Sequence, residues 1–146
     1  MEEDYPQDLL EFEDRFSNEA RCIEYLRALR WTEGFICPHC GEKCAWRTNR
    51  GLLHCIQCGR QTSVTAGTIL HSTRKPLQLW FHAMWHITGQ KYGANALGLQ
   101  RALNLGSYHT AWQWLQKLRR AMVRPGRDKL SGLVEVDETY VGGKKP

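Results

Sequence analysis

The sequence predicts an α+β protein in which a small zinc ribbon is followed by a helical region. Two C-x-x-C pairs, separated by fourteen residues, lie in a stretch rich in β-prone residues. From Pro76 onward, apolar residues recur at the three- and four-residue spacing of amphipathic helices. The length of 146 residues allows one domain of ordinary size or two small ones.

The charge of +5 is distributed unevenly along the chain. Residues 1–20 carry eight acids against Arg15 alone, a local charge of −7, and the remainder carries +12. A basic body fits a polyanion such as nucleic acid, because neutralised phosphates release counterions; a charge surplus that serves only solubility is the alternative. No apolar run approaches the ~20 residues of a membrane span, and the acidic N-terminus does not resemble a secretory signal. We therefore expect a cytoplasmic, nucleoid-associated protein without a membrane partner.

The two cysteine pairs have the spacing of a zinc site. They supply Cys37, Cys40, Cys55 and Cys58, and a glycine follows each pair. Glycine tolerates the positive φ that a turn aiming two sulfurs at one ion often needs. Four thiolates complete a tetrahedron and leave no position for water, so this zinc is expected to be structural.

Other metal-binding side chains lie near these pairs. Cys44, His39 and His54 could each replace one thiolate, but a regular site needs none of them. Cys22 falls on the apolar face of an expected helix and is interpreted as a small core residue.

The residues around the cysteines predict a zinc ribbon over residues 33–70. Strands are expected at 45–47, 52–54 and 61–65, with a hairpin turn at Thr48-Asn49-Arg50-Gly51. So small a unit buries little apolar surface, so the metal should hold it folded. Its exposed cations are candidate phosphate contacts or simply solvate the sheet: Lys43, Arg47, Arg50 and Arg60.

Helices are expected on both sides of the ribbon. The N-terminal helix lies within residues 15–32 and begins near Ser17. Its apolar side, which is expected to face the core, comprises Cys22, Ile23, Leu26 and Leu29. Residues 1–14 have charge without a clear period and are interpreted as a mobile or loosely docked acidic arm. A helical region follows at 71–125, with helices from Pro76 to Gly89, from about Ala94 to Leu103, and from Ser107 to Val123.

The last of these helices has two faces. Its apolar stripe comprises Ala111, Leu115, Leu118 and Met122. The opposite stripe is polar and basic and comprises His109, Gln113, Gln116, Lys117 and Arg120. A basic helix that follows a helix and a short turn is typical of a helix-turn-helix reader, whose last helix enters the major groove. An ordinary three-helix bundle with a solvated outer face is the alternative.

Beyond a turn at residues 124–127, residues 133–141 alternate as a strand. Val134 and Val136 fall on one face and Glu135 and Asp137 on the other. Carboxylates on one face can hold a hard cation such as Mg²⁺, although acidic strand faces are common without one.

Taken together, these motifs resemble one family of transposases. They are Tyr25-Leu26, Arg30-Trp31, the two cysteine pairs, Ser107-Tyr108, Thr110-Ala111-Trp112 and the segment 134–143. Their order is similar to that of the IS1595 (ISXO2-like) insertion-sequence transposases, from about residue 15 to the C-terminus. The resemblance implies a zinc ribbon and helical DNA-binding region joined to an RNase H-like domain that begins at residues 130–146, with Asp137 as the first acid of its metal-binding set. Glu135 and Glu138 are not implied as ligands.

The resemblance also implies an activity, a cofactor and a partner. Two Mg²⁺ ions held by three carboxylates would promote phosphoryl transfer during DNA transposition. Because the chain ends at Pro146, the RNase H-like domain is expected to be truncated. We therefore expect this polypeptide to bind double-stranded DNA at terminal inverted repeats without cutting it, with Mg²⁺ relevant only to a complete domain. A homodimer is compatible with the sequence.

Two other functions fit the same motifs. A transcriptional regulator could combine a zinc ribbon with a helix-turn-helix and perform no chemistry. A protein–protein adaptor could use the ribbon alone, and its affinity for duplex DNA would then hardly depend on salt.

Overall fold

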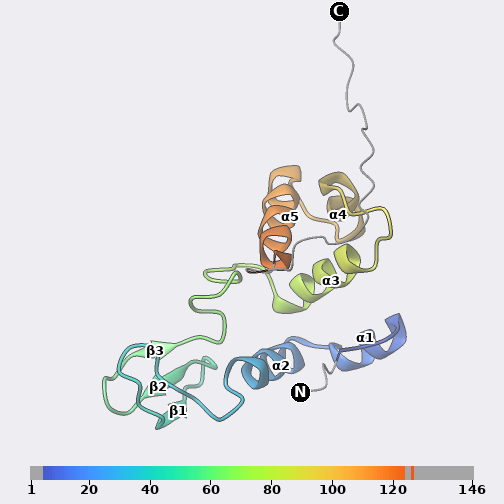
Figure 1. Cartoon of the computed structure of the whole chain (residues 1–146). Coiled ribbons are helices and arrows are strands. Elements are labelled where there is room, and N and C mark those ends of the chain that lie inside the picture. Colours follow the sequence, from blue (N-terminus) through green and yellow to red (C-terminus); the bar gives the residue numbers. More distant parts are fainter. Residues whose placement is uncertain (1–4, 124–125, 127–146) are drawn as a thin grey trace, which may run out of the picture.

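The computed structural model describes residues 5–123 and residue 126 (Figure 1). Five helices and three strands follow in the order α1 (Leu9–Arg15), α2 (Glu19–Arg30), β1 (Ala45–Arg47), β2 (Leu53–Cys55), β3 (Gln61–Thr62), α3 (Leu77–Thr88), α4 (Ala96–Ala102) and α5 (Tyr108–Met122). In Figure 1 the sheet lies at one end, α2 leads from it toward the other helices, and α3, α4 and α5 gather together. The expected strand at 130–146 and Asp137 lie outside the described residues.

The three strands form one antiparallel sheet in the order β1-β2-β3. The turn between β1 and β2 lies where it was predicted: the Gly51 N–H donates to the Thr48 carbonyl at 2.9 Å, and Gly51 has a φ of 77°. The third strand is shorter than expected and ends at Thr62.

The N-terminal segment corrects one expectation. Residues 9–15 are not a mobile or loosely docked arm but the helix α1, which begins after Asp8, whose carboxylate accepts from the Glu11 N–H at 2.8 Å. Phe12 and Phe16 are 3% and 4% exposed. The Phe12 ring stacks on Trp85 of α3 at 4.9 Å between centroids. Two aromatic side chains therefore dock an otherwise acidic segment onto α3.

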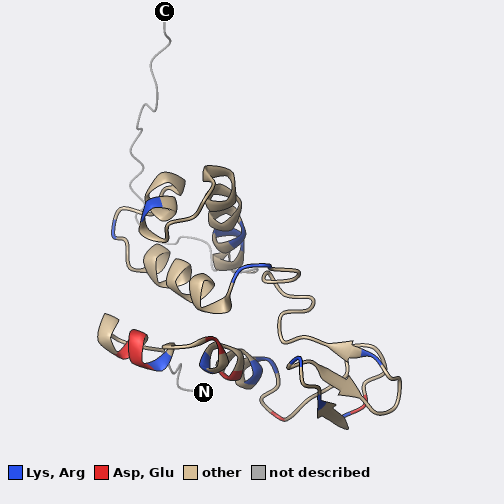
Figure 2. Ribbon diagram, turned by 180° about the vertical axis from the view of Figure 1, so that it is seen from behind, with Lys and Arg blue, Asp and Glu red and all other residues tan. Residues whose placement is uncertain are grey.

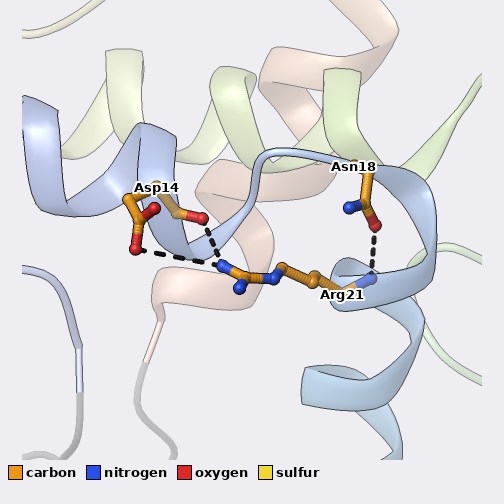
Figure 3. A network of polar contacts seen from close by, with 3 residues as sticks. All are labelled: Asp14, Asn18 and Arg21. Carbon is orange, nitrogen blue, oxygen red and sulfur yellow. Dashed lines mark hydrogen bonds and ion pairs between the residues drawn. The ribbon is translucent and has the colours of Figure 1, made fainter.

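The junction between α1 and α2 is polar (Figure 3). The Asn18 side chain accepts from the Arg21 N–H at 3.0 Å and begins α2 one residue later than Ser17 would have. The Arg21 guanidinium donates to the Asp14 carbonyl at 2.6 Å and lies 3.9 Å from the Asp14 carboxylate. These contacts order the turn between the two helices.

Both ends of α2 are fixed to other elements. At its start, the Glu19 carboxylate accepts from the backbone N–H groups of Leu77 and Gln78 at 2.9 and 3.0 Å. These are the first N–H groups of α3, and Pro76 before them offers no side-chain cap. At its end, the Arg30 guanidinium donates to the carbonyls of Ser63 and Val64 at 3.3 and 2.8 Å. Since α2 has twelve residues, it spans about 18 Å between the ribbon and the helical region.

The stripe predicted on α2 is inward only in part. Cys22 is fully buried, as expected of a core residue, and burial, with a contribution from Glu19, raises the pKa of its thiol to about 11. Leu29 is 59% exposed, which corrects its assignment to the inner face.

The helices α3, α4 and α5 share an apolar core. The indole rings of Trp80 and Trp114 stack with centroids 3.7 Å apart, and Leu99 of α4 and Ala111 of α5 are fully buried. Met122 was expected in this core but is 52% exposed, because it lies at the last residue of α5. None of the described helices has the length and apolar character needed to cross a membrane.

The connection between α4 and α5 is the tight turn that the sequence predicts. Asn104 adopts a left-handed φ of 48°, and the Leu105 N–H donates to the Gln100 carbonyl at 2.9 Å. Leu105 is 3% exposed and anchors the turn in the core. A Cβ at Gly98 of α4 would first meet the side chain of Asn95, which caps the same helix.

Candidate zinc centre and nucleic-acid interface

The two cysteine pairs fold into turns with the same backbone hydrogen bonds. In the first, the Gly41 N–H donates to the Cys37 carbonyl at 2.9 Å, and the Cys37 N–H donates to the Glu42 carbonyl at 2.9 Å. The second repeats this pattern from Gly59 to Cys55 at 3.0 Å and from Cys55 to Arg60 at 2.9 Å. The φ angles of Gly41 and Gly59 are 74° and 69°, as the glycine after each pair predicted.

These turns bring the four predicted sulfur ligands together. All four Sγ atoms lie within 4.8 Å of one another, with 3.7 Å between Cys37 and Cys58 and 3.5 Å between Cys40 and Cys55. A tetrahedral zinc with Zn–S bonds of about 2.3 Å needs sulfurs about 3.8 Å apart. A disulfide needs about 2.0 Å, and all four cysteines are free. The donor set and its spacing therefore fit one tetrahedral zinc ion.

The protonation of the sulfurs is set by their surroundings. The backbone N–H groups of Cys40 and His39 favour the Cys37 thiolate and lower its pKa to about 6. At Cys40 the N–H of Glu42 acts in the same direction, but desolvation and the nearby sulfurs, Cys55 first, outweigh it and raise the pKa to about 12. Four thiolates this close repel one another, and a divalent cation would remove that repulsion.

The alternative ligands lie outside the cluster. Cys44 and His39 are exposed, and none of Cys44, His39 and His54 belongs to the sulfur cluster found among the described residues. His54 instead packs its ring against Trp46, with centroids 4.9 Å apart. The ribbon thus needs no ligand beyond its four cysteines.

The distribution of charge separates two parts of the molecule (Figure 2). Residues 43–123 contain eleven Lys and Arg and no Asp or Glu. The acidic residues of the described chain lie at or before Glu42, and those on α1 and α2 are seen in Figure 2. The sheet and the helices α3 to α5 are therefore built from one continuous basic stretch of chain, and its positive charge attracts polyanions.

The predicted contact residues of α5 all lie on its exposed side. His109, Gln113, Gln116, Lys117 and Arg120 are exposed, and the His109 and Gln113 side chains hydrogen-bond to each other at 2.9 Å. The buried side comprises Ala111, Trp114, Leu115 and Leu118.

The sequence analysis assigned no structural role to three aromatic residues of α5. Trp114 belongs to the core, whereas Tyr108 and Trp112 are 53% and 45% exposed. The position of Trp114, four residues before Leu118 and three after Ala111, is the signal that could have assigned it.

The cations predicted on the ribbon occupy separate places. Arg47 ends β1, Arg50 lies in the turn that follows, and Arg60 precedes β3. All three are exposed. They therefore lie in three different segments of the ribbon.

Comparison with known proteins fits this geometry. Residues 17–61 match the family model described as the transposase zinc-ribbon domain. Over these residues the chain is similar to the zinc ribbon of the IS1595 transposases. The match contains all four cysteines and the whole of β1 and β2, so the zinc ribbon seen in the structure is the one that the family describes.

A longer similarity extends beyond the ribbon. The chain is 30% identical over 131 residues to an uncharacterized protein in transposable element ISH50 of Halobacterium salinarum. The aligned part covers 86% of this chain and 43% of that relative, so the chain spans less than half of the relative's length. No solved structure matches this chain. The chain is thus related to proteins of transposable elements.

Proposed function

We propose that the chain is the DNA-recognising part of an insertion-sequence transposase and binds the terminal inverted repeats of its element. The observation that carries the proposal is the exposed polar and basic face of α5, in a chain whose ribbon is of the transposase type. A role as a transcriptional regulator needs the same contacts but leaves the ribbon's family unexplained.

The position of α5 suits the major groove. A core of Trp80, Leu99 and Trp114 holds one side of α5 against α3 and α4, and within residues 5–123 its other side is exposed. In helix-turn-helix proteins the helix after the turn lies in the groove and its N-terminal half meets base edges. Gln113 and Gln116 can make bidentate contacts to adenine, whereas Lys117 and Arg120 can bind phosphates.

The fixed ends of α2 support contact of both modules with one duplex. The Glu19 carboxylate joins α2 to α3, and the Arg30 guanidinium joins it to the chain just after β3. Both junctions are charge-assisted hydrogen bonds, which strengthen the attachment of α2 to the ribbon and to α3. We infer that the ribbon cations contact phosphates beside the site read by α5.

Fluorescence anisotropy with a terminal-repeat duplex and a scrambled duplex tests the proposal. Affinity should fall steeply with salt, and Lys117→Ala or Arg120→Ala should each reduce the salt slope by about 1 without changing sequence preference. Gln113→Ala should instead reduce the preference for the repeat, and Gln7→Ala, an exposed amide before α1, should do neither. Equal binding of both duplexes, with no dependence on salt, would contradict the proposal.

The catalytic role implied for Asp137, and the Mg²⁺ that it would help to bind, stay predictions. That residue lies outside the part of the chain that the structure describes. DNA recognition by the ribbon and α5 does not depend on it.

A further inference from the structure

One face of the ribbon carries a row of polar and aromatic side chains. Trp46 of β1 pairs with His54 of β2, which pairs with Gln61 of β3. Residues directly opposite in antiparallel strands share a face, so these three side chains lie side by side across the sheet. We name Trp46, His54 and Gln61 the Trp46 row.

The other face of the sheet is the buried one. Cys55 is fully buried at the zinc centre and Thr62 is 6% exposed, and each follows a member of the Trp46 row along its strand. Successive side chains of a strand point to opposite faces. The Trp46 row therefore faces away from the zinc.

The Trp46 row is more open than folding alone requires. Trp46 is 53% exposed and Gln61 is exposed, although an indole normally buries most of its surface. The Trp46 and His54 rings lie 4.9 Å apart with 35° between their planes, so His54 packs against one side of the indole, which is still 53% exposed. Among the described residues, the Nδ1 atom of His54 is buried and has no hydrogen-bond partner.

The charge around the Trp46 row selects a polyanion. Between residues 43 and 62 the chain has Lys43, Arg47, Arg50 and Arg60 and no acid. Arg50 lies in the turn that follows β1, whereas Arg47, the residue after Trp46 in the strand, points to the opposite face of the sheet. An exposed aromatic ring in a basic segment is the combination that binds single-stranded nucleic acid, in which bases stack on rings and cations track the backbone.

We propose that the Trp46 row is a second DNA site, which stacks an unpaired base on the exposed indole of Trp46. Bases inside a duplex have both faces covered by their neighbours, so only an unpaired or terminal base can offer one. The Gln61 amide can hydrogen-bond the edge of that base, and Arg50, four residues after Trp46, lies near enough along the chain to bind a phosphate. This inference rests on the proposed DNA binding and adds a substrate class to it: a duplex with a single-stranded tail.

Binding of tailed and blunt duplexes tests the proposal. We compare a blunt terminal-repeat duplex with the same duplex bearing a five-nucleotide tail, placed at either end, by fluorescence anisotropy. The wild-type protein should bind one tailed duplex about 5- to 100-fold more tightly than the blunt one. Trp46→Ala should abolish that ratio while the blunt duplex is bound as before, and Trp46→Phe should keep most of it. Ile56→Ala, which removes a 65% exposed apolar side chain elsewhere on the ribbon, should leave the ratio unchanged.

A fluorescence measurement on the wild-type protein tests the same proposal without relying on variants that fail to fold. A 2-aminopurine base in the tail should lose fluorescence on binding, because stacking on an aromatic ring quenches it. A tail ratio near one without quenching, while the blunt duplex is still bound, would overturn the Trp46 row and leave the proposed function intact. Failure to bind any of the DNAs would overturn both. Capture of an apolar peptide by the Trp46 row in place of the tail would also overturn the proposal.

Discussion

Replacing Glu19 by alanine should weaken the junction between α2 and α3. The Glu19 carboxylate accepts from the first two N–H groups of α3 at 2.9 and 3.0 Å, and Pro76 offers no side-chain substitute. Loss of a side-chain cap costs about 1 kcal/mol, and the negative charge at a helix N-terminus contributes about 0.3 to 1 kcal/mol more. Leu77 is buried, so water replaces its bond poorly. We expect Glu19→Ala to lower the free energy of unfolding by about 2 kcal/mol.

Urea unfolding of the zinc-saturated protein, followed by circular dichroism, measures this change. Glu19→Gln keeps one acceptor oxygen but removes the charge, so we expect about 1 kcal/mol for it. Glu24→Ala is the matched control, because Glu24 is an exposed acid of the same helix, and surface changes of this kind cost less than about 0.5 kcal/mol. Equal losses for Glu19→Ala and Glu24→Ala would refute the reasoning.

Two further predictions concern α1 and the metal. Phe12→Ala should release α1 from α3 and cost about 3 kcal/mol, because a ring that is 3% exposed leaves a cavity; hydrogen exchange of α1 should rise, whereas Leu10→Ala, at a 78% exposed position, should leave exchange unchanged. Zinc uptake by the metal-free protein at pH 7.5 should release protons, because zinc binds thiolates. The Cys40 thiol, whose pKa is raised to about 12, is protonated at this pH and must lose its proton, whereas Cys37, whose pKa is lowered to about 6, is already a thiolate. Zinc affinity should therefore increase with pH, and titration calorimetry in buffers of different ionisation enthalpy that detects no proton release would contradict this.

The ribbon was predictable because its determinants are local. The spacing of the cysteines, the glycines after them and the turn ending at Gly51 each act within a few residues, and the structure has all of them. The same holds for α5, whose buried and exposed faces follow from its period, except at its last residue, where Met122 is 52% exposed.

The features that sequence reasoning missed depend on distant partners. The helix α1 is stable because Phe12 meets Trp85, and no local period of residues 1–14 reveals that contact. The cap of α3 comes from Glu19, fifty-eight residues before the N–H group that it accepts from. Trp46 was placed on a strand but not recognised as a surface, because which face the zinc occupies emerges only from the strand register.

X-ray absorption at the zinc edge tests the central claim most directly. The protein purified with zinc should hold one ion per chain, bound by four sulfurs at about 2.3 Å, because Cys37, Cys40, Cys55 and Cys58 already lie at nearly tetrahedral spacing. A spectrum with nitrogen or oxygen ligands, or a reduced protein that binds no zinc, would contradict the account.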